Sequence, residues 1–371
     1  MPAQTLVAAP ITVPITGRRL IAEVLPSASE LAVGHRRIHR KAALIIGLDV
    51  VGYYGLVIAP IGIVGRILCA IVLAHGLLTT ATGIMHDANH GAFARRRAVN
   101  RLFAYSGDVL GASSWMWKFQ HNELHHRHTN VEGVDGDIDQ MPFARLTPSQ
   151  PWKPRHRFQH LYMWPLYGFL TLQWFVASDY RTLFAGGIGT QKFVRRPRAA
   201  DNARMFGGKL VHLTWALVIP MLFHPFWDVV LVYLACSWAV GFALAVIFQM
   251  AHCVDNAEFL SDDLRHRGDD VVRHQLRTTV DVRIRGRAAR VYFGFLTGGL
   301  EYQVEHHLAP RVPHTLYAGM ATRVAAMCDR NGIEYRFHES VPAALASHVR
   351  WLRQMGARPV ELRLVRGDRP E

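Results

Sequence analysis

Charged residues are scarce in this sequence, and cysteine is scarcer still. Only 19% of the 371 residues are Asp, Glu, Lys or Arg, while half are hydrophobic. The four cysteines are scattered without CxxC spacing, which excludes a disulfide framework and a cysteine-ligated zinc or iron–sulfur site. No HExxH motif is present either, so the sequence does not predict an intramembrane zinc protease.

The charge that is present is mostly positive and unevenly placed. The formal net charge is +14, and arginine-rich stretches alternate with long apolar runs. No arginine run accompanies a motif that reads bases, so nucleic acid is not an expected partner. Alternation of this kind is typical of a membrane protein whose basic segments face the cytosol and anionic lipid.

The apolar runs predict an all-α integral membrane protein with four transmembrane helices in two hairpins. At about 1.5 Å per residue, each run is roughly long enough to cross a hydrocarbon layer, the third being the shortest. Short breaks at Pro60-Ile61-Gly62 and His224-Pro225-Phe226 make each pair of runs antiparallel. The predicted spans are residues 43–59, 67–85, 210–223 and 229–250.

The distribution of basic residues orients these hairpins. The 224–226 turn has no Lys or Arg, whereas the flanks of both hairpins carry many, so both termini and the central loop should be cytosolic. We expect residues 1–40 to be a mobile or membrane-surface lead and 41–315 to be the membrane domain with a cytosolic helical cap. Residues 316–371 should form a cytosolic helical tail packed on that cap. Residues 161–177 should form an interfacial or half-buried helix rather than a span.

Three histidine clusters lie beside or between these predicted spans. They read HDANH at 86–90 (the first cluster), HNELHH at 121–126 (the second) and QVEHH at 303–307 (the third). Within a helix, residues at i,i+3 or i,i+4 share a face, so each cluster can present its side chains together. Several neutral imidazoles side by side have little use except metal binding.

The predicted topology brings the clusters to one side of the membrane, together with His252 at the cytosolic end of the fourth span. Eight imidazoles exceed what one metal ion needs, so two ions are implied, and Fe, Zn or Cu would suit a thiolate-free nitrogen site. The expected ligands are His86, His90, His121, His125, His126, His252, His306 and His307. We predict no catalytic side chain beyond this metal centre.

Neighbouring polar residues have secondary roles in this interpretation. Gln303 stands three residues before His306 and should position water or a neighbouring imidazole. Asp87 and Glu305 adjoin ligands and could either orient them or be solvated acids. His128 should face elsewhere.

Ionisable groups within the predicted spans (His75, His212 and Asp49) should make interhelical hydrogen bonds. The remaining histidines should lie on the surface.

The clusters and their context resemble the three histidine boxes of the membrane fatty acid desaturases. Matching context includes HHRHTN and GVDGDID after the second cluster, HQLRTT at 274–279 and GGLEYQVEHHLAP around the third. The resemblance covers about residues 65–315 and, more loosely, the stretch with Asn331-Gly332-Ile333. Glutamine at the start of the third box is similar to the front-end acyl desaturases, although Glu301 stands where those enzymes often carry a neutral residue.

The resemblance implies a non-heme di-iron enzyme that uses O2 to insert a cis double bond into a long-chain acyl group. The acyl group would be carried on CoA, a carrier protein or a lipid. The eight histidines would be the iron ligands. No fused cytochrome b5 domain is recognised, which implies an external electron donor such as ferredoxin with its reductase, or cytochrome b5. The excess of arginine over lysine hints at a bacterial source, and hence a bacterial plasma membrane.

Two other functions remain open on the sequence. A hydroxylase or ketolase of the same fold, acting on an alkane, sterol or carotenoid, would carry much the same boxes. A non-enzymatic metal carrier would place its histidines along a path within the spans, whereas these gather at one membrane surface.

Overall fold

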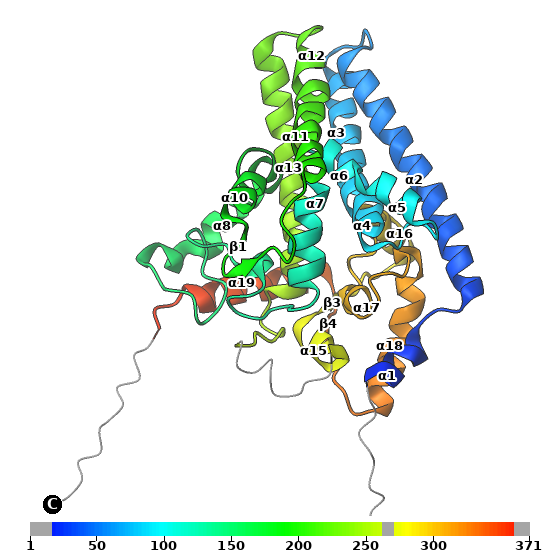
Figure 1. The fold of residues 1–371 in the computed structure, drawn as a ribbon, viewed down its shortest axis with the longest axis vertical. Coiled ribbons are helices and arrows are strands. Elements are labelled where there is room, and N and C mark those ends of the chain that lie inside the picture. The colour runs from blue at the N-terminus through cyan, green and yellow to red at the C-terminus, as the bar shows by residue number, and fades with distance from the viewer. Residues whose placement is uncertain (1–16, 262–270, 360–371) are drawn as a thin grey trace, which may run out of the picture.

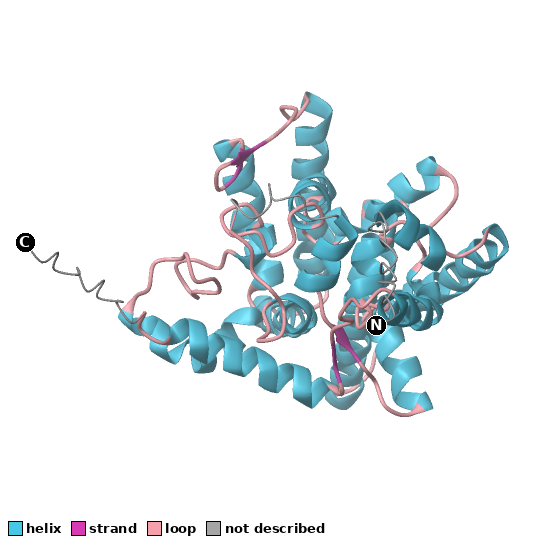
Figure 2. Ribbon diagram, turned by 90° about the horizontal axis from the view of Figure 1, so that it is seen from below, coloured by secondary structure: helices cyan, strands magenta, loops and turns pink. Residues whose placement is uncertain are grey.

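The computed structural model describes residues 17–261 and 271–359, which are mostly helical. Figure 2 shows that helices dominate and that the strands are short. The antiparallel pair is β1 (Gly187–Ile188) with β2 (Gln191–Lys192), and the parallel pair is β3 (Asp281–Val282) with β4 (Phe337–His338). The prediction of an all-α fold is confirmed.

The first long hairpin joins α2 (Ala28–Val57) to α3 (Ile63–Thr80), and the two helices pack side by side. A π-helical turn, η1 (Ala81–Met85), continues α3 without interruption into α4 (His86–His90). The first histidine cluster therefore forms the end of a continuous helix from Ile63 to His90.

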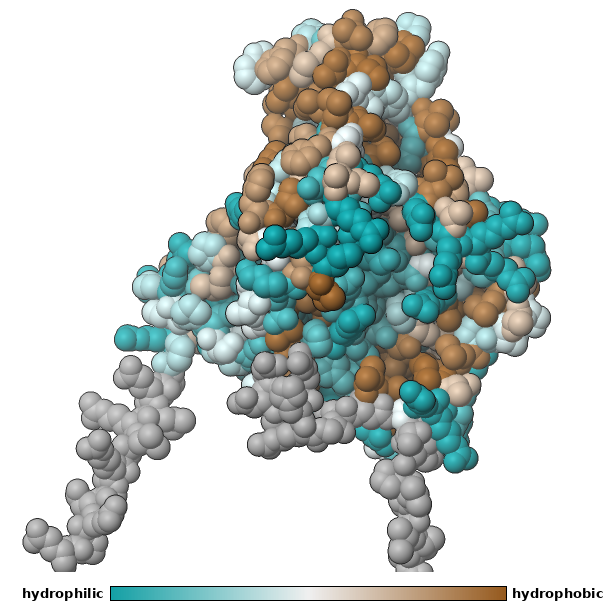
Figure 3. Space-filling view, in the orientation of Figure 1, coloured by the Kyte–Doolittle hydropathy of each residue, from teal (hydrophilic) through white to brown (hydrophobic). Residues whose placement is uncertain are grey.

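The second long hairpin has the same plan. Its first arm is α11 (Ala199–Leu213), η6 (Thr214–Val218) and α12 (Ile219–Met221), and its second arm is α13 (Phe226–His252). Both hairpins project upward in Figure 1. In Figure 3, apolar side chains cover the upper part of this face, and hydrophilic ones gather below it.

Length and composition single out two helices of the described chain as able to cross a membrane. They are Ile63–His90 and Phe226–His252, which correspond to the second and fourth predicted spans. The helices at the first and third predicted spans are longer than expected: α2 begins at residue 28 and α11 at residue 199.

The predicted lead of residues 1–40 is described from residue 17 onward, and there it is helical and packed. In α1 (Gly17–Val24), Leu20 and Val24 are fully buried against α15 (Val271–Thr278) and α18 (Tyr317–Arg330). Ser27 then caps α2 through a reciprocal capping box with Glu30. An apolar face on α1 and a strong helix start therefore give residues 17–40 a helical, packed structure in place of a mobile one, while the alternative of a position on the membrane surface stays a prediction. Residues 1–16 lie outside the described chain.

The remaining elements surround the lower ends of the hairpins. The predicted interfacial helix over 161–177 is broken into α8, α9 and η5, and α19 packs against α8 and α13. The full set of helices around the lower ends of the hairpins is α5 (Arg97–Ala104), α6 (Ser106–Val109), α7 (Ser114–Trp117), η2 (Lys118–His125), η3 (Gly136–Ile138), η4 (Pro154–Phe158), α8 (Gln159–Tyr167), α9 (Leu170–Gln173), η5 (Trp174–Ser178), α10 (Asp179–Ala185), α15 (Val271–Thr278), α16 (Arg287–Leu296), α17 (Gln303–Leu308), η7 (His314–Leu316), α18 (Tyr317–Arg330) and α19 (Val341–Gly356).

Candidate metal centre

The three clusters and His252 converge at the lower end of the hairpins. One set of ring nitrogens, the four-histidine group, has every member within 4.8 Å of the others. It takes two residues from the first cluster and one each from the second and third. Its members are His86, His90, His121 and His306.

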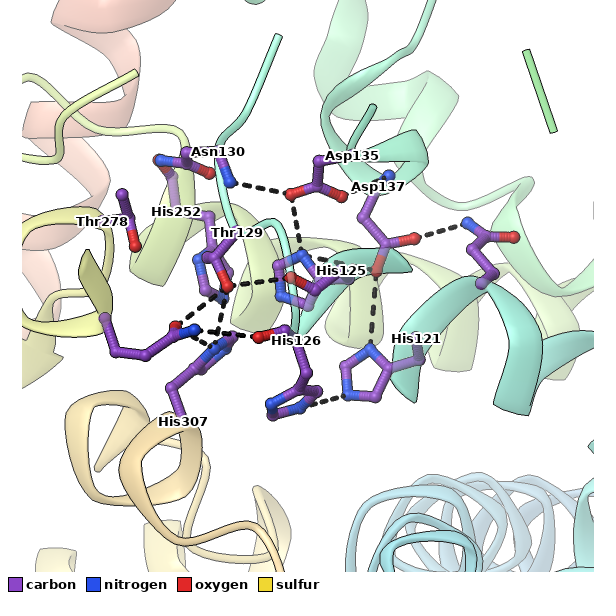
Figure 4. A network of polar contacts seen from close by, with 12 residues as sticks. His121, His125, His126, Thr129, Asn130, Asp135, Asp137, His252, Thr278 and His307 are labelled. Atoms are coloured by element: carbon purple, nitrogen blue, oxygen red, sulfur yellow. Dashed lines mark hydrogen bonds and ion pairs between the residues drawn. The ribbon is translucent and has the colours of Figure 1, made fainter. Parts of the chain in front are cut away.

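A second set, the three-histidine group, lies beside the first and is buried. It takes one histidine from the second cluster, one from the end of α13 and one from the third cluster, again within 4.8 Å of one another. Its members, His125, His252 and His307, are at most 5% exposed. Figure 4 shows these three rings close together.

His126 lies between the two groups. Its ring nitrogen is within 4.8 Å of those of His306 and His307, one from each group. Its ring stacks on that of His307 with centroids 4.2 Å apart. The structure thus brings all eight predicted ligands together in two adjacent sets, as two metal ions would require. That they are ligands stays a prediction.

The second cluster departs from the α-helical geometry that the sequence predicts. Residues 118–125 form a π-helical turn, closed by a hydrogen bond from the His126 backbone N–H to the His121 carbonyl. Another π-helical turn, η1, directly precedes the first cluster. Such wide turns are rare and occur mostly at functional sites. In this turn, residues five positions apart lie next to each other, so the ring of His126 contacts that of His121. In an α-helix the two rings would point in different directions.

Unpartnered ring nitrogens test whether the site fits a metal. Among the described residues, seven of the eight histidines have a buried ring nitrogen without a hydrogen-bond partner. A buried polar atom left unsatisfied costs about 1–3 kcal/mol, so this set would be strongly destabilising without a ligand. Nitrogen lone pairs directed into a common space are the donors that a transition metal needs.

Four of these rings also have the protonation state that metal binding requires. Burial holds the pKa of His121, His126, His306 and His307 well below its usual range, so these imidazoles are neutral. His125 is different. Burial alone would lower its pKa, but the neighbouring carboxylates of Asp135 and Asp137 outweigh burial and raise it.

Hydrogen bonds from the rear nitrogens orient the rings of the three-histidine group. His125 Nδ1 lies 2.9 Å from Asp135 Oδ2, which also accepts the Asn130 backbone N–H at 2.9 Å. His307 Nδ1 lies 2.9 Å from Gln275 Oε1. In both cases the opposite nitrogen, Nε2, is left to face the group (Figure 4). Metal-binding histidines are held in this way by carboxylates and carbonyls.

The three residues predicted to support the ligands are all buried. Asp87 Oδ1 lies 3.5 Å from His86 Nδ1. The Gln303 side chain contacts the ring of His252. Glu305 instead meets Asp281 and the Tyr335 hydroxyl, and burial raises its pKa well above the usual value.

Known proteins match this chain over most of its length. The sequence profile described as fatty acid desaturase matches residues 61–339. The sn-1 linoleoyl-lipid 6-desaturase of Arthrospira platensis is 32% identical over 324 residues, covering 86% of each chain. The enzyme of the same name from Synechocystis sp. is 31% identical over 80% of this chain and 82% of its own. An acyl-lipid (8-3)-desaturase of Physcomitrium patens is 29% identical over 87% of this chain and 67% of its own.

This chain belongs to the fatty acid desaturase family. It is therefore an oxidoreductase that acts on fatty acyl chains. Its histidine groups fit the metal-binding character of such an enzyme.

The desaturase has a cavity of about 520 Å³ against its histidines. His86, His121, His252 and His306 form part of the wall, together with Gln303. Apolar and aromatic side chains supply most of the remainder, including Met85, Ala112, Trp117, Met163, Leu166, Phe169, Leu170, Ala245 and Phe248. An apolar space that ends at a nitrogen-rich site suits a methylene chain.

Other expectations about the polar residues of the desaturase are confirmed. Asp49 accepts a hydrogen bond from Thr80 across the first hairpin at 2.7 Å. His212 Nε2 lies 3.0 Å from the Tyr233 hydroxyl on α13, and His75 Nε2 lies 3.2 Å from that of Tyr292 on α16.

Sequence reasoning missed several residues that contact the histidines. Asp135, Asp137, Gln275 and Tyr317 were not identified, although GVDGDID and HQLRTT contain the first three. His314, expected at the surface with the remaining histidines, is only 5% exposed. The expectation of surface positions is also wrong for His156, His274, His338 and His348, which are buried.

Proposed function

We propose that this desaturase inserts a cis double bond into the acyl chain of a membrane glycerolipid, near its carboxyl end. Two of its relatives are named linoleoyl-lipid 6-desaturases, and Gln303 opens the third cluster as in front-end enzymes. The observation that carries the proposal is structural: imidazoles with unpartnered nitrogens border an apolar cavity.

The proposed cofactor is a pair of non-heme iron ions. The four-histidine group would hold one and the three-histidine group the other, with His126 between them. When bound, the irons supply O2 activation and removal of two hydrogen atoms from adjacent methylenes, which acid–base chemistry by side chains cannot do. O2 leaves as two molecules of water, so two further electrons and two protons must be provided.

The protein's own residues present one carbon pair to this centre. Phe248 and Trp117 lie in the cavity wall and contact histidine rings directly, so a chain beside them passes close to the metal site. Gln303 faces the same cavity from beside His306. Holding the chain in a narrow apolar space excludes water and fixes which carbons are near.

The proposed topology has four membrane spans. Ile63–His90 and Phe226–His252 are supported by length and composition. The other two spans would be in α2 and in the α11–α12 arm, whose exposed apolar side chains include Val50, Val51, Leu210 and Leu222. Such side chains outside a hairpin are suited to contact with lipid.

The histidine side of the protein would then face the cytosol of a bacterial cell, together with both termini. Within this frame, residues 41–315 form the membrane domain and 316–371 a cytosolic tail. The two electrons would come from an external donor, ferredoxin with its reductase or cytochrome b5. The basic cytosolic surface is suited to an acidic partner of this kind.

Expression in a bacterial host that contains linoleoyl lipids tests the proposal. Gas chromatography–mass spectrometry of the lipid fatty acids should reveal a triene with its new double bond between the carboxyl group and the existing ones. His306→Ala should abolish this product. A hydroxylated acyl chain, or an oxidised alkane or terpenoid with unchanged acyl chains, would contradict the proposal and favour a hydroxylase or ketolase.

A further inference from the structure

A short segment after the third cluster contacts both the first and the third clusters. The carboxylate Oδ2 of Asp87 accepts two hydrogen bonds from His314, from the backbone N–H at 3.1 Å and from ring Nδ1 at 2.9 Å. Three residues further on, the Tyr317 hydroxyl lies 3.2 Å from His306 Nδ1. His314 and Tyr317 are 5% and 1% exposed, so water does not compete for these contacts.

The hydrogen-bond partners fix the tautomer of His314. Lys41 Nζ lies 3.0 Å from His314 Nε2 and 2.9 Å from the Gly294 carbonyl oxygen. An ammonium group can only donate, so Nε2 must accept. In the neutral imidazole the hydrogen is then on Nδ1 and points at Asp87. Lys41 thereby ties the segment to α2.

The same reasoning applies to His306. Its Nε2 is buried without a partner and belongs to the four-histidine group. A metal ligand needs that lone pair, which leaves the hydrogen on Nδ1, where the Tyr317 oxygen accepts it. His86, next to Asp87, has its ring 4.5 Å from that of His306. Tyr317 therefore contacts a ring of the four-histidine group directly, whereas His314 holds Asp87, whose Oδ1 lies 3.5 Å from the neighbouring ring at His86 Nδ1.

We propose that His314 and Tyr317 are positioning residues that fix the first and third clusters relative to each other in the four-histidine group. The proposal rests on the metal centre described above. It assigns a role to two residues outside the histidine clusters, with Lys41 as their anchor on α2.

The three-histidine group has its own, separate support. Gln275 on α15 accepts from His307 Nδ1 at 2.9 Å and donates from Nε2 to the His126 carbonyl at 2.8 Å. The described contacts of Gln275 do not include His314 or Tyr317. Loss of one support should therefore weaken one metal position and leave the other largely intact.

Titration of the detergent-purified, metal-free full chain with Co²⁺ tests this separation, because visible absorption reports each ion without any need for activity. The wild type should bind two ions. Tyr317→Phe, which removes one oxygen atom, should weaken one binding step about 10–100-fold. Tyr162→Phe is the matched control, since its hydroxyl meets only the Phe143 carbonyl oxygen among the described contacts. It should bind both ions like the wild type.

A double variant identifies which position is affected. In His86→Ala, the four-histidine group is already impaired, so adding Tyr317→Phe should not weaken the ion that remains. Adding Gln275→Leu should weaken it. His314→Ala should behave like Tyr317→Phe, and His314→Asn should recover binding, because its amide nitrogen stands near Nδ1 and can donate to Asp87.

Two results overturn the proposal. One is unchanged binding of both ions by Tyr317→Phe and His314→Ala; the other is a further loss when Tyr317→Phe is added to His86→Ala. Both leave the proposed function standing if the wild type binds two ions and makes the unsaturated product. Fewer than two ions in the wild type would instead overturn the two-metal centre, and this proposal with it.

Discussion

The Nε2 atoms of His121 and His126 lie 3.2 Å apart, although the two residues are five positions apart in the chain. In an α-helix, residues three and four apart share a face, so position 126 would be turned away from 121. The π-helical turn of η2 removes this offset. It allows three histidines of one short segment to serve two adjacent groups.

This arrangement predicts that His126 is indispensable. His126→Ala should lower iron content and reduce product formation more than about 100-fold, a larger effect than is usual for residues that only support a ligand. Metal analysis of the purified protein and fatty acid profiling of expressing cells measure the two effects. His128→Ala, two residues away, should retain both iron and activity. Wild-type behaviour of His126→Ala would remove His126 from the site.

Much of this site could be predicted from the sequence because its signals are local. Spacing within each cluster and the position of His86 and His252 at helix ends follow from the chain itself. The π-helical turns could not be predicted, since they depend on tertiary contacts rather than on residue type. Similarly, the packing of α1 (Gly17–Val24) depends on α15 and α18, which are distant in sequence.

The supporting residues were harder to predict for the same reason. Asp135 meets His125 across ten residues, and Gln275 meets His307 across 32, through a fold that spacing alone does not reveal. The position of His314 could not be predicted in the same way, because a histidine directly after Pro313 and four residues after Pro310 looks like part of a surface loop. Its burial follows only from its bonds to Asp87 and Lys41.

Asp135 gives a second prediction. Asp135→Asn keeps the shape of the side chain but replaces a carboxylate with an amide, which is a weaker acceptor for His125 Nδ1. The amide also carries no charge to oppose the lowering of the His125 pKa by burial. Metal affinity should fall about 10–100-fold. Competition with a chelator measures the change. Asp139→Asn is the control, because that side chain is exposed and contacts no histidine among the described residues. Equal affinity of the two variants would contradict the role of Asp135.

The cavity gives a third prediction, about substrate size. Ala245 lines the cavity on α13, and a leucine there would occupy space that a long chain needs. Ala245→Leu should reduce conversion of an 18-carbon acyl chain relative to a 14-carbon chain about tenfold, equivalent to roughly 1.4 kcal/mol. Feeding both acids to an expressing strain and comparing products measures the ratio. Ala239→Leu makes the same change on the exposed side of α13 and should leave the ratio unchanged. A ratio that moves equally in both variants would show that the cavity does not hold the chain.

His348 gives a prediction about pH and stability. It is 1% exposed, its Nδ1 donates to the Cys253 carbonyl oxygen at 2.7 Å, and its Nε2 accepts from the Tyr167 hydroxyl at 2.7 Å. Burial lowers its pKa to about 4. Both ring nitrogens are used by the neutral form, so a proton on Nε2 would force the buried Tyr167 hydroxyl to turn away and accept a hydrogen bond instead of donating one.

The sign of the effect follows from linkage. Below about pH 6.5 the unfolded chain binds a proton at this histidine and the folded chain does not, so stability is lost as the pH falls toward 4. His348→Asn keeps a donor for Cys253 and cannot titrate. Between pH 7.5 and 4.5, the wild type should lose roughly 2–3 kcal/mol more unfolding free energy than this variant. Denaturant unfolding of the metal-free protein at both values measures the difference, and the other histidines cancel because both proteins contain them. Parallel losses in the two proteins would mean that His348 accepts its proton without disturbing the contact between α19 and α8.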